Sequence, residues 1–105
     1  MKVKLSELCD VIRSKNAGPF ELTFDIIFKE FEVFKKICDS GQINKASISD
    51  LLNIPEEEII AIVNFEPSKA IKITVKRRIC SGDLGETDVY GAQQHAPFLS
   101  MTVEV

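Results

Sequence analysis

The sequence is poor in residues that mark specialised classes of protein. Its 105 residues include no tryptophan, one tyrosine, one histidine and three cysteines. The cysteines, Cys9, Cys38 and Cys80, form no Cys-x-x-Cys pair, and one of them stays unpaired under any disulfide scheme. This usage favours a reduced, cytoplasmic protein over a disulfide-linked secreted one.

Long apolar runs are missing as well. The longest, residues 59–63, is far too short to span a bilayer. The first seven residues lack the apolar core of a signal peptide. We therefore expect neither secretion nor membrane insertion.

Excess positive charge is also absent. A formal net charge of −3 argues against a nucleic-acid partner, because phosphate binding relies on clustered Lys and Arg in excess. One local basic cluster exists at Lys72, Lys76, Arg77 and Arg78. We expect these residues to form a solvated strand end whose charges discourage edge pairing. The alternative is a binding site for a phosphate or carboxylate on a small ligand or partner.

What is present is an ordinary globular composition, with 45% hydrophobic and 28% charged residues. The length suits one hydrophobic core, so we expect a single domain over residues 1–105.

The first half of the chain changes its hydrophobic period several times. Ser6 can cap a helix that ends near Ser14 or Lys15, in which Leu8, Cys9 and Ile12 share a face, although a strand is possible for the first few residues. Residues 13–19 have loop composition, and residues 20–28 alternate as a strand with one aromatic-rich face. A helix from residue 30 to Gly41 and a second helix, capped by Asn44 and ending at Leu52, should follow.

The second half of the chain is predicted to form mainly strands. Residues 56–58 form an acidic run without the partners of a metal site, and we expect solvated surface there. Residues 59–63 predict a central strand that is buried on both faces. After a turn at residues 66–69, alternation predicts an antiparallel strand over residues 71–75 and another strand over residues 99–105.

These elements predict a two-layer α+β fold. Residues 29–58 are long enough for a crossover that would make the two strands they join parallel if adjacent. We therefore expect a mixed four-stranded sheet with two or three short helices, in a ferredoxin-like arrangement.

Residues 82–97 concentrate hydrogen-bonding side chains where no regular period runs. They hold the only histidine and the only tyrosine, together with two glutamines and two aspartates. Connections of this length are usually functional or disordered, and apolar anchors such as Leu84 and Val89 favour function.

Residues 13–25, RSKNAGPFELTFD, and residues 87–97, TDVYGAQQHAP, closely resemble the signatures of an uncharacterised family of small single-domain proteins. The similarity covers the whole chain. Members of that family are typically encoded beside, or fused behind, a larger protein like AtuA of acyclic-terpene utilisation. The resemblance therefore implies a partner protein but no reaction.

Residues 13–18 also resemble the early Arg-Ser-Gly-Asp-Lys-Gly loop in the ferredoxin-fold C-terminal domain of AtuA-like proteins. Here Lys15 follows Ser14 where that loop has Gly, and Asn16 stands at or beside the position of its Asp. A shared fold is implied, but a shared ligand is not.

Two groups of polar residues are the candidate site. Arg13, Ser14, Lys15 and Asn16 offer donors that suit a carboxylate or phosphoryl group. Gln93 and Gln94 can position a polar ligand, and His95 is the natural general acid or base, with Tyr90 or Asp88 orienting a proton transfer. This catalytic role requires the two groups to meet, and a lone histidine in a polar loop is more often a structural hydrogen-bonding group. A thiolate pair of Cys80 with His95 is disfavoured because nothing nearby marks an activated nucleophile.

The preferred function is a small subunit of a complex with an AtuA-like protein, contributing these residues to a shared site for an organic acid or acyl-thioester. The alternative is a regulatory or structural interaction module without catalysis. We expect neither a metal nor another cofactor in this chain, and self-association is left open. An independent enzyme is disfavoured, because the sequence contains no metal-ligand cluster, phosphate loop or nucleophile motif.

Overall fold

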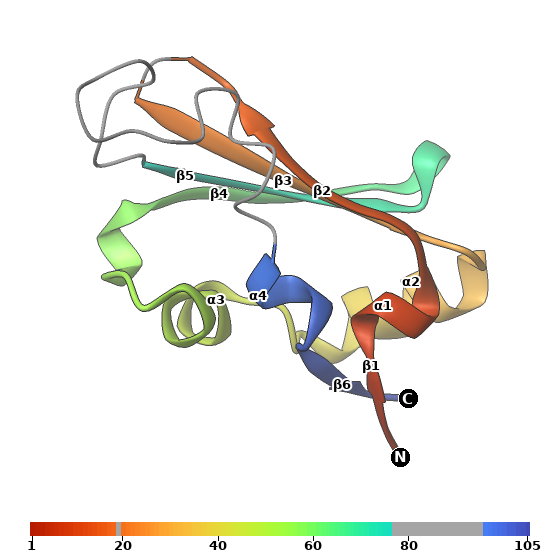
Figure 1. Ribbon diagram of the computed structural model, residues 1–105. Coiled ribbons are helices and arrows are strands. Elements are labelled where there is room, and N and C mark those ends of the chain that lie inside the picture. The colour runs from red at the N-terminus through yellow and green to blue at the C-terminus, as the bar shows by residue number, and fades with distance from the viewer. Residues whose placement is uncertain (19, 77–95) are drawn as a thin grey trace.

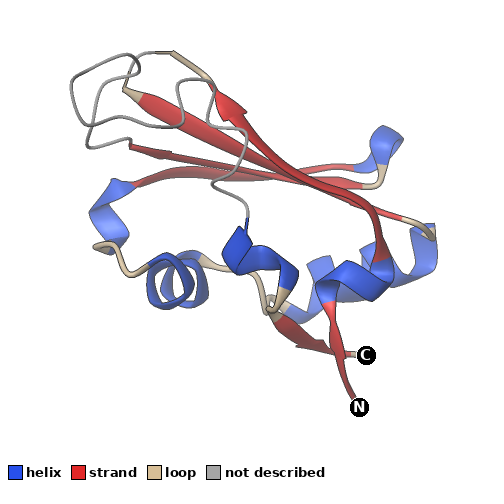
Figure 2. Cartoon of the chain, in the orientation of Figure 1, coloured by secondary structure: helices blue, strands red, loops and turns tan. Residues whose placement is uncertain are grey.

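Helices lie along one face of a twisted sheet in the computed structural model (Figure 1). The structure describes residues 1–18, 20–76 and 96–105. The strands are β1 (Lys2–Lys4), β2 (Cys9–Asn16), β3 (Glu21–Phe28), β4 (Ile59–Phe65), β5 (Ala70–Lys76) and β6 (Thr102–Glu104). The helices are α1 (Leu5–Leu8), α2 (Phe31–Ser40), α3 (Lys45–Leu52) and α4 (Ala96–Leu99), with 3-10 turns η1 (Glu56–Glu58) and η2 (Glu66–Ser68) (Figure 2).

The main sheet has the strand order β2-β3-β5-β4, and every neighbouring pair is antiparallel. The predicted two-layer α+β fold with a four-stranded sheet is confirmed, but the prediction of a mixed sheet was wrong. Strands β3 and β4 do run in the same direction, yet β5 lies between them. A strand, a helical crossover and a second strand with a third inserted between them form the split β-α-β unit of ferredoxin-like folds. Here β2 occupies the remaining edge position.

The structure overturns the prediction of a helix over residues 6–15 and of a loop from Arg13. Between residues 5 and 16 the helix is limited to α1, and β2 continues to Asn16 in a hairpin with β3. A bulge between Cys9 and Val11 shifts the alternation of β2 by one residue. Apolar side chains consequently recur at a spacing that imitates a helical face. The alternative of a strand in the first few residues is confirmed by β1.

Strand β4 is at the edge of the sheet, so the prediction of a central strand was wrong. Its Ile60 and Val63 are about half exposed, and a bulge lies between Ile59 and Ala61. The expected strand over residues 99–105 is also shorter, and it does not join the main sheet. Instead β6 pairs with β1, which brings the two ends of the chain together.

The helices and strands with a strong local signal are where they were predicted. Strand β3 and its antiparallel neighbour β5 bury one face each. Helix α2 ends at Ser40 and is followed by Gly41, whose φ of +70° suits glycine. Cys38 packs against the core, as expected. Buried side chains from the two layers meet in one core: Leu22, Phe24, Ile26 and Phe28 of β3, Ile71, Ile73 and Val75 of β5, and Leu5, Phe34, Ile37, Ile48, Phe98 and Val103 from the covering layer.

A capping box holds the start of α3. The side chain of Asn44 accepts a hydrogen bond from the backbone N–H of Ser47 at 2.9 Å, and the Ser47 hydroxyl accepts one from the backbone N–H of Asn44 at 3.0 Å. Asn44→Ala should therefore lower the free energy of unfolding by about 1 kcal/mol in urea titration. Lys45→Ala, at an exposed position in the same turn, is the control. Equal losses from the two variants would contradict the importance of the cap.

Candidate functional site

The face of the main sheet that lies away from the helices carries a row of charges. Within the described residues no helix or strand packs on this face, which we call the open face (Figure 1). In β2, Arg13 and Lys15 are two residues apart and project to it, since side chains alternate along a strand. Arg13 lies opposite Asp25 of β3, and Asp25 lies opposite Lys72 of β5. The fold thus aligns a cation, a carboxylate and a second cation across three strands.

Asp25 is the centre of this row. Its carboxylate oxygen Oδ2 accepts a hydrogen bond from Arg13 Nε at 3.0 Å and lies 3.7 Å from Lys15 Nζ. The Asp25 side chain is only 3% exposed, whereas those of Arg13 and Lys15 are 54% and 57% exposed. Removing a carboxylate from water is costly, and these two cations offset that cost. The result is a buried anion beneath two cations whose outer parts reach solvent.

The second carboxylate oxygen of Asp25 is unsatisfied. Oδ1 is buried, and it has no hydrogen-bond partner among the residues that the structure describes. Lys72 lies opposite in the next strand, but its Nζ is 5.5 Å from the centroid of the Phe65 ring, in cation–π geometry. The β5 cation opposite Asp25 therefore lies over an aromatic ring.

The open face continues into an apolar margin along β4. The register places Val63 beside Lys72 and Phe65 beside Ala70, and both β4 side chains are about half exposed. No residue of β4 is charged. Edge strands usually carry charges, prolines or other features that prevent further pairing, and a bulge near Ile59 is the device visible here.

The structure divides the first group of predicted site residues. Arg13 and Lys15 come together on Asp25, whereas Ser14 is buried and alternates to the side that faces the helices, as does the half-buried Asn16. The four side chains therefore do not form one ligand-binding loop. The second group, Asp88, Tyr90, Gln93, Gln94 and His95, lies outside the described residues, as do Arg77, Arg78 and Cys80.

Asp25 is the residue that sequence reasoning missed. The alternation of residues 20–28 predicted only that Asp25 is one of the polar residues on the exposed side of a strand. The available signal was that it is the acidic residue in the middle of β3, facing away from the aromatic side, with basic residues at matching positions of the strands that pair with it.

The two described cysteines are not activated nucleophiles. Burial raises the pKa of Cys9 from 9.0 to about 12, Asp10 adds to the rise, and Lys29 opposes it. The pKa of Cys38 is also raised, first by burial and then by Asp39. A reactive thiol needs a lowered pKa, so neither residue has the required environment.

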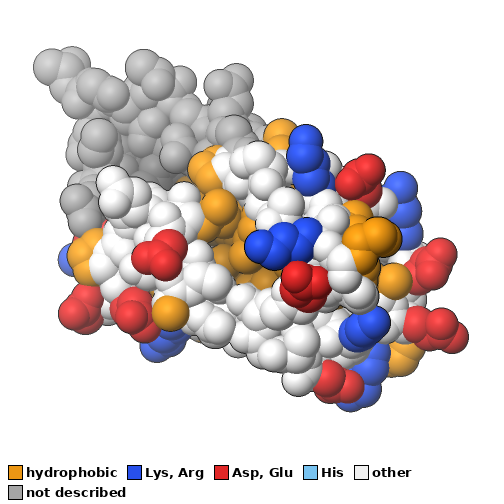
Figure 3. Space-filling model, turned by 90° about the horizontal axis from the view of Figure 1, so that it is seen from below, with side chains coloured by type: hydrophobic (Ala, Val, Ile, Leu, Met, Phe, Trp, Pro, Cys, Tyr) orange, Lys and Arg blue, Asp and Glu red, His pale blue; other side chains and the backbone are white. Residues whose placement is uncertain are grey.

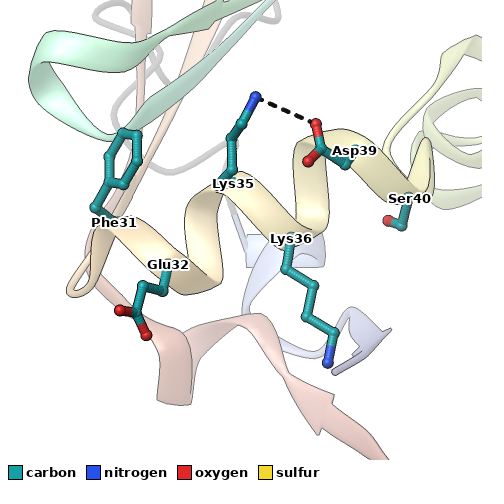
Figure 4. Close-up of a pocket in the computed structure, with 6 residues that line it drawn as sticks. All are labelled: Phe31, Glu32, Lys35, Lys36, Asp39 and Ser40. Carbon is teal, nitrogen blue, oxygen red and sulfur yellow. Dashed lines mark ion pairs between the residues drawn. The ribbon is translucent and has the colours of Figure 1, made fainter.

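Two surface depressions lined by described residues lie away from the charged row. One, of about 580 Å³, is lined by residues of α2 alone: Phe31, Glu32, Lys35, Lys36, Asp39 and Ser40 (Figure 4). Its side chains spread around one helix, and Lys35 pairs with Asp39 at 3.4 Å. Another lies between α3 and the segment leading into β6, on the face where hydrophobic side chains gather near the middle (Figure 3). Neither brings together groups that suggest a reaction.

Within residues 1–18, 20–76 and 96–105, no three His, Cys, Asp or Glu side chains are grouped so that they could hold a metal ion. In the same residues, no helix has the length and apolarity needed to cross a membrane.

Comparison with known proteins identifies a family for this chain. The model of a family described as a domain of unknown function, DUF4387, matches residues 5–102, which includes every described residue of the charged row. No curated protein and no solved structure matches the chain.

Proposed function

The chain belongs to the DUF4387 family of domains of unknown function, and we propose that it is a small subunit of a complex with a larger AtuA-like protein. In that complex it contributes polar side chains to a shared site for an organic acid or an acyl-thioester. The family resemblance of residues 13–25 and 87–97 suggests the partner, and the open sheet face offers a surface for it.

The observation that carries the proposal is the composition of this open face. A chain with a net charge of −3 places four cations, Arg13, Lys15, Lys72 and Lys76, on one side of its sheet, together with the two carboxylates Glu21 and Asp25 that lie opposite three of them. Exposed apolar side chains of β4 border these cations. Aromatic and aliphatic side chains next to polar and charged ones are the usual composition of a protein interface, and the cations suit an anionic substrate as well.

The shape of the described surface supports a shared site. Ligand pockets usually bury most of a small molecule among converging side chains. Among the described residues, no helix or strand covers the sheet face that carries the charged row (Figure 1), and the two depressions described above lie on other surfaces. A second protein placed against the open face would supply the missing enclosure.

Residues outside the described part of the chain complete the proposed site. His95 acts as the general acid or base, and Tyr90 or Asp88 orients the proton transfer. Gln93 and Gln94 position the polar groups of the substrate. Arg13 and Lys15 bind its carboxylate or another anionic group.

Co-expression with an AtuA-like protein tests the proposal. We expect the two proteins to co-purify through size-exclusion chromatography, and turnover of the organic acid or thioester to require both. Phe65→Ala should weaken the complex about tenfold, since truncating an interface aromatic typically costs more than 1 kcal/mol. Isothermal titration calorimetry of the two purified proteins measures the change.

Phe31→Ala is the matched control. Phe31 is 48% exposed and Phe65 is 44% exposed, but Phe31 lies on α2, away from the open sheet face. Its truncation should leave the affinity unchanged. Full activity of the large protein alone, or equal weakening by the two variants, would refute the proposal.

The alternative function is a regulatory or structural module that uses the same face only for docking. The observation in its favour is that Arg13 and Lys15 are already engaged by Asp25 within the chain. The same experiment separates the two functions. A stable complex in which the large protein has the same turnover with and without this chain would support the module.

A further inference from the structure

The unsatisfied oxygen of Asp25 points to a specific ligand. Buried polar atoms in folded proteins almost always have hydrogen-bond partners, so an exception calls for an explanation. Asp25 Oδ1 is such an exception among the described residues, and the side chain that carries it is only 3% exposed. An ionised carboxylate oxygen can only accept hydrogen bonds. The missing partner is therefore a donor.

The charges around Asp25 define the rest of the ligand. Arg13 and Lys15 both approach the same oxygen, Oδ2. Two positive charges therefore face one negative charge, and the three side chains together have a net charge of +1. Lys72, opposite Asp25 in β5, adds a further positive charge to this face. Arg13 and Lys15 are more than half exposed, so an anion from solvent can reach them. A guanidinium group beside an ammonium group is well suited to a carboxylate.

We propose that Arg13, Lys15 and Asp25 form a binding site for a hydroxy acid. The ligand carboxylate binds the exposed ends of Arg13 and Lys15, and its hydroxyl group donates a hydrogen bond to Asp25 Oδ1. This inference rests on the proposed function, because it specifies which organic acid the shared site takes.

Oδ1 is buried, so the ligand hydroxyl can reach it only after the groups around Asp25 rearrange. Lys15 is the more weakly held of the two cations, because 3.7 Å between Nζ and Oδ2 exceeds hydrogen-bond distance. Arg13 stays in place through its hydrogen bond of 3.0 Å. When the Lys15 ammonium leaves Oδ2 to follow the ligand carboxylate, the Asp25 carboxylate turns about its Cβ–Cγ bond and presents Oδ1 to the ligand hydroxyl.

Other ligand classes fit these groups less well. A simple carboxylic acid leaves Oδ1 without a donor, and a phosphate places more negative charge against Asp25. The ammonium group of an amino acid would donate to Oδ1, but it would lie among Arg13, Lys15 and Lys72, where like charges repel it. A neutral hydroxyl group avoids that repulsion.

The test is a titration of the full-length chain, followed by amide NMR shifts, with lactate, propionate, alanine and inorganic phosphate at constant ionic strength. Lactate, as either enantiomer, should bind about tenfold or more tightly than propionate, because a site built to bond a hydroxyl rejects the analogue that lacks it. The shifts should centre on Arg13, Lys15 and Asp25. Asp25→Ala should abolish the preference for lactate, whereas Lys35→Met on α2 should preserve it.

Several results would overturn the inference: no binding of lactate, equal binding of lactate and propionate, tighter binding of alanine or phosphate, or shifts centred on another surface. The comparison of lactate with propionate needs only the unchanged chain, so it decides the question even if Asp25→Ala does not fold. Co-purification with the large protein is measured separately. A chain that forms the complex but shows no preference for lactate refutes this inference alone, whereas a chain that prefers lactate without a complex refutes the proposed function.

Discussion

Phe24→Ala should lower the free energy of unfolding by about 3–5 kcal/mol, a large share of the roughly 5–15 kcal/mol that stabilises a typical domain. Phe24 is buried on the helix-facing side of β3, and its ring centroid lies 4.8 Å from that of Phe98. Phe98 belongs to α4, so this contact fastens the C-terminal segment to the sheet. The substitution removes the apolar area of one ring, leaves a cavity and deprives Phe98 of its aromatic partner.

Urea unfolding followed by circular dichroism measures this loss, and the same chain offers a matched control. Phe20→Ala makes the identical substitution at an exposed position just before β3, where the free energy of unfolding should change by no more than about 0.5 kcal/mol. A loss below about 1 kcal/mol at Phe24 would mean that the contact between β3 and α4 contributes little to the fold.

Elements whose residues carry their own signal were predictable from the sequence. Strand β3 alternates without interruption from Leu22 to Phe28, and α2 has a regular apolar face and a glycine at its end. The start of α3 was predictable because Asn44 and Ser47 cap the helix through contacts three residues apart. All of this information lies within one or two helical turns or one strand.

Elements that depend on distant partners were not predictable in the same way. The bulge after Cys9 breaks the alternation of β2, and only its pairing with β3 reveals a strand. The apolar run of β4 is compatible with a central or an edge strand, since a short apolar run does not show how many neighbours it has. The position of β6 beside β1 joins the two ends of the chain, which no local pattern encodes.

The candidate site shows the same limit. Arg13 and Lys15 were recognised as cations, but a loop was expected where the structure has a strand, and strand alternation sends Ser14 to the opposite side. Asp25 lies opposite Arg13 because the turn between β2 and β3 sets the register, with the backbone N–H of Ala17 donating to the carbonyl of Glu21 at 3.0 Å. Gly18, at a φ of +140°, allows that turn. Charge pairing across a hairpin follows from register, which sequence patterns do not fix.

The thiol of Cys9 should react with iodoacetamide far more slowly than a free cysteine. Burial, reinforced by Asp10, raises its pKa from 9.0 to about 12, so the thiolate population at neutral pH falls about a thousandfold. Because the thiolate is the nucleophile, alkylation should slow by a similar factor, and restricted access to the buried sulfur should slow it further. Peptide mass spectrometry at timed intervals measures Cys9 and Cys38 in the same sample.

Cys38 provides the internal comparison, because it is only half buried, although its pKa is also raised by burial. It should be alkylated before Cys9. Alkylation of Cys9 at the rate of a free thiol, under conditions where the chain stays folded, would show that this end of β2 opens readily to solvent.

The same pKa makes stability depend on pH in a defined window. The folded chain keeps the Cys9 proton up to about pH 12, whereas the unfolded chain loses it above about pH 9. The stabilisation is therefore fully present below pH 9 and is lost as the pH rises, by up to about 1.4 kcal/mol for each pH unit between 9 and 12. Cys9→Ala removes the titrating group, so its free energy of unfolding, measured in urea at a series of pH values, should fall less steeply in this window. Equal slopes for the two chains would mean that Cys9 is ionised at a lower pH in the folded state, and with it that the junction between α1 and β2 is open to water.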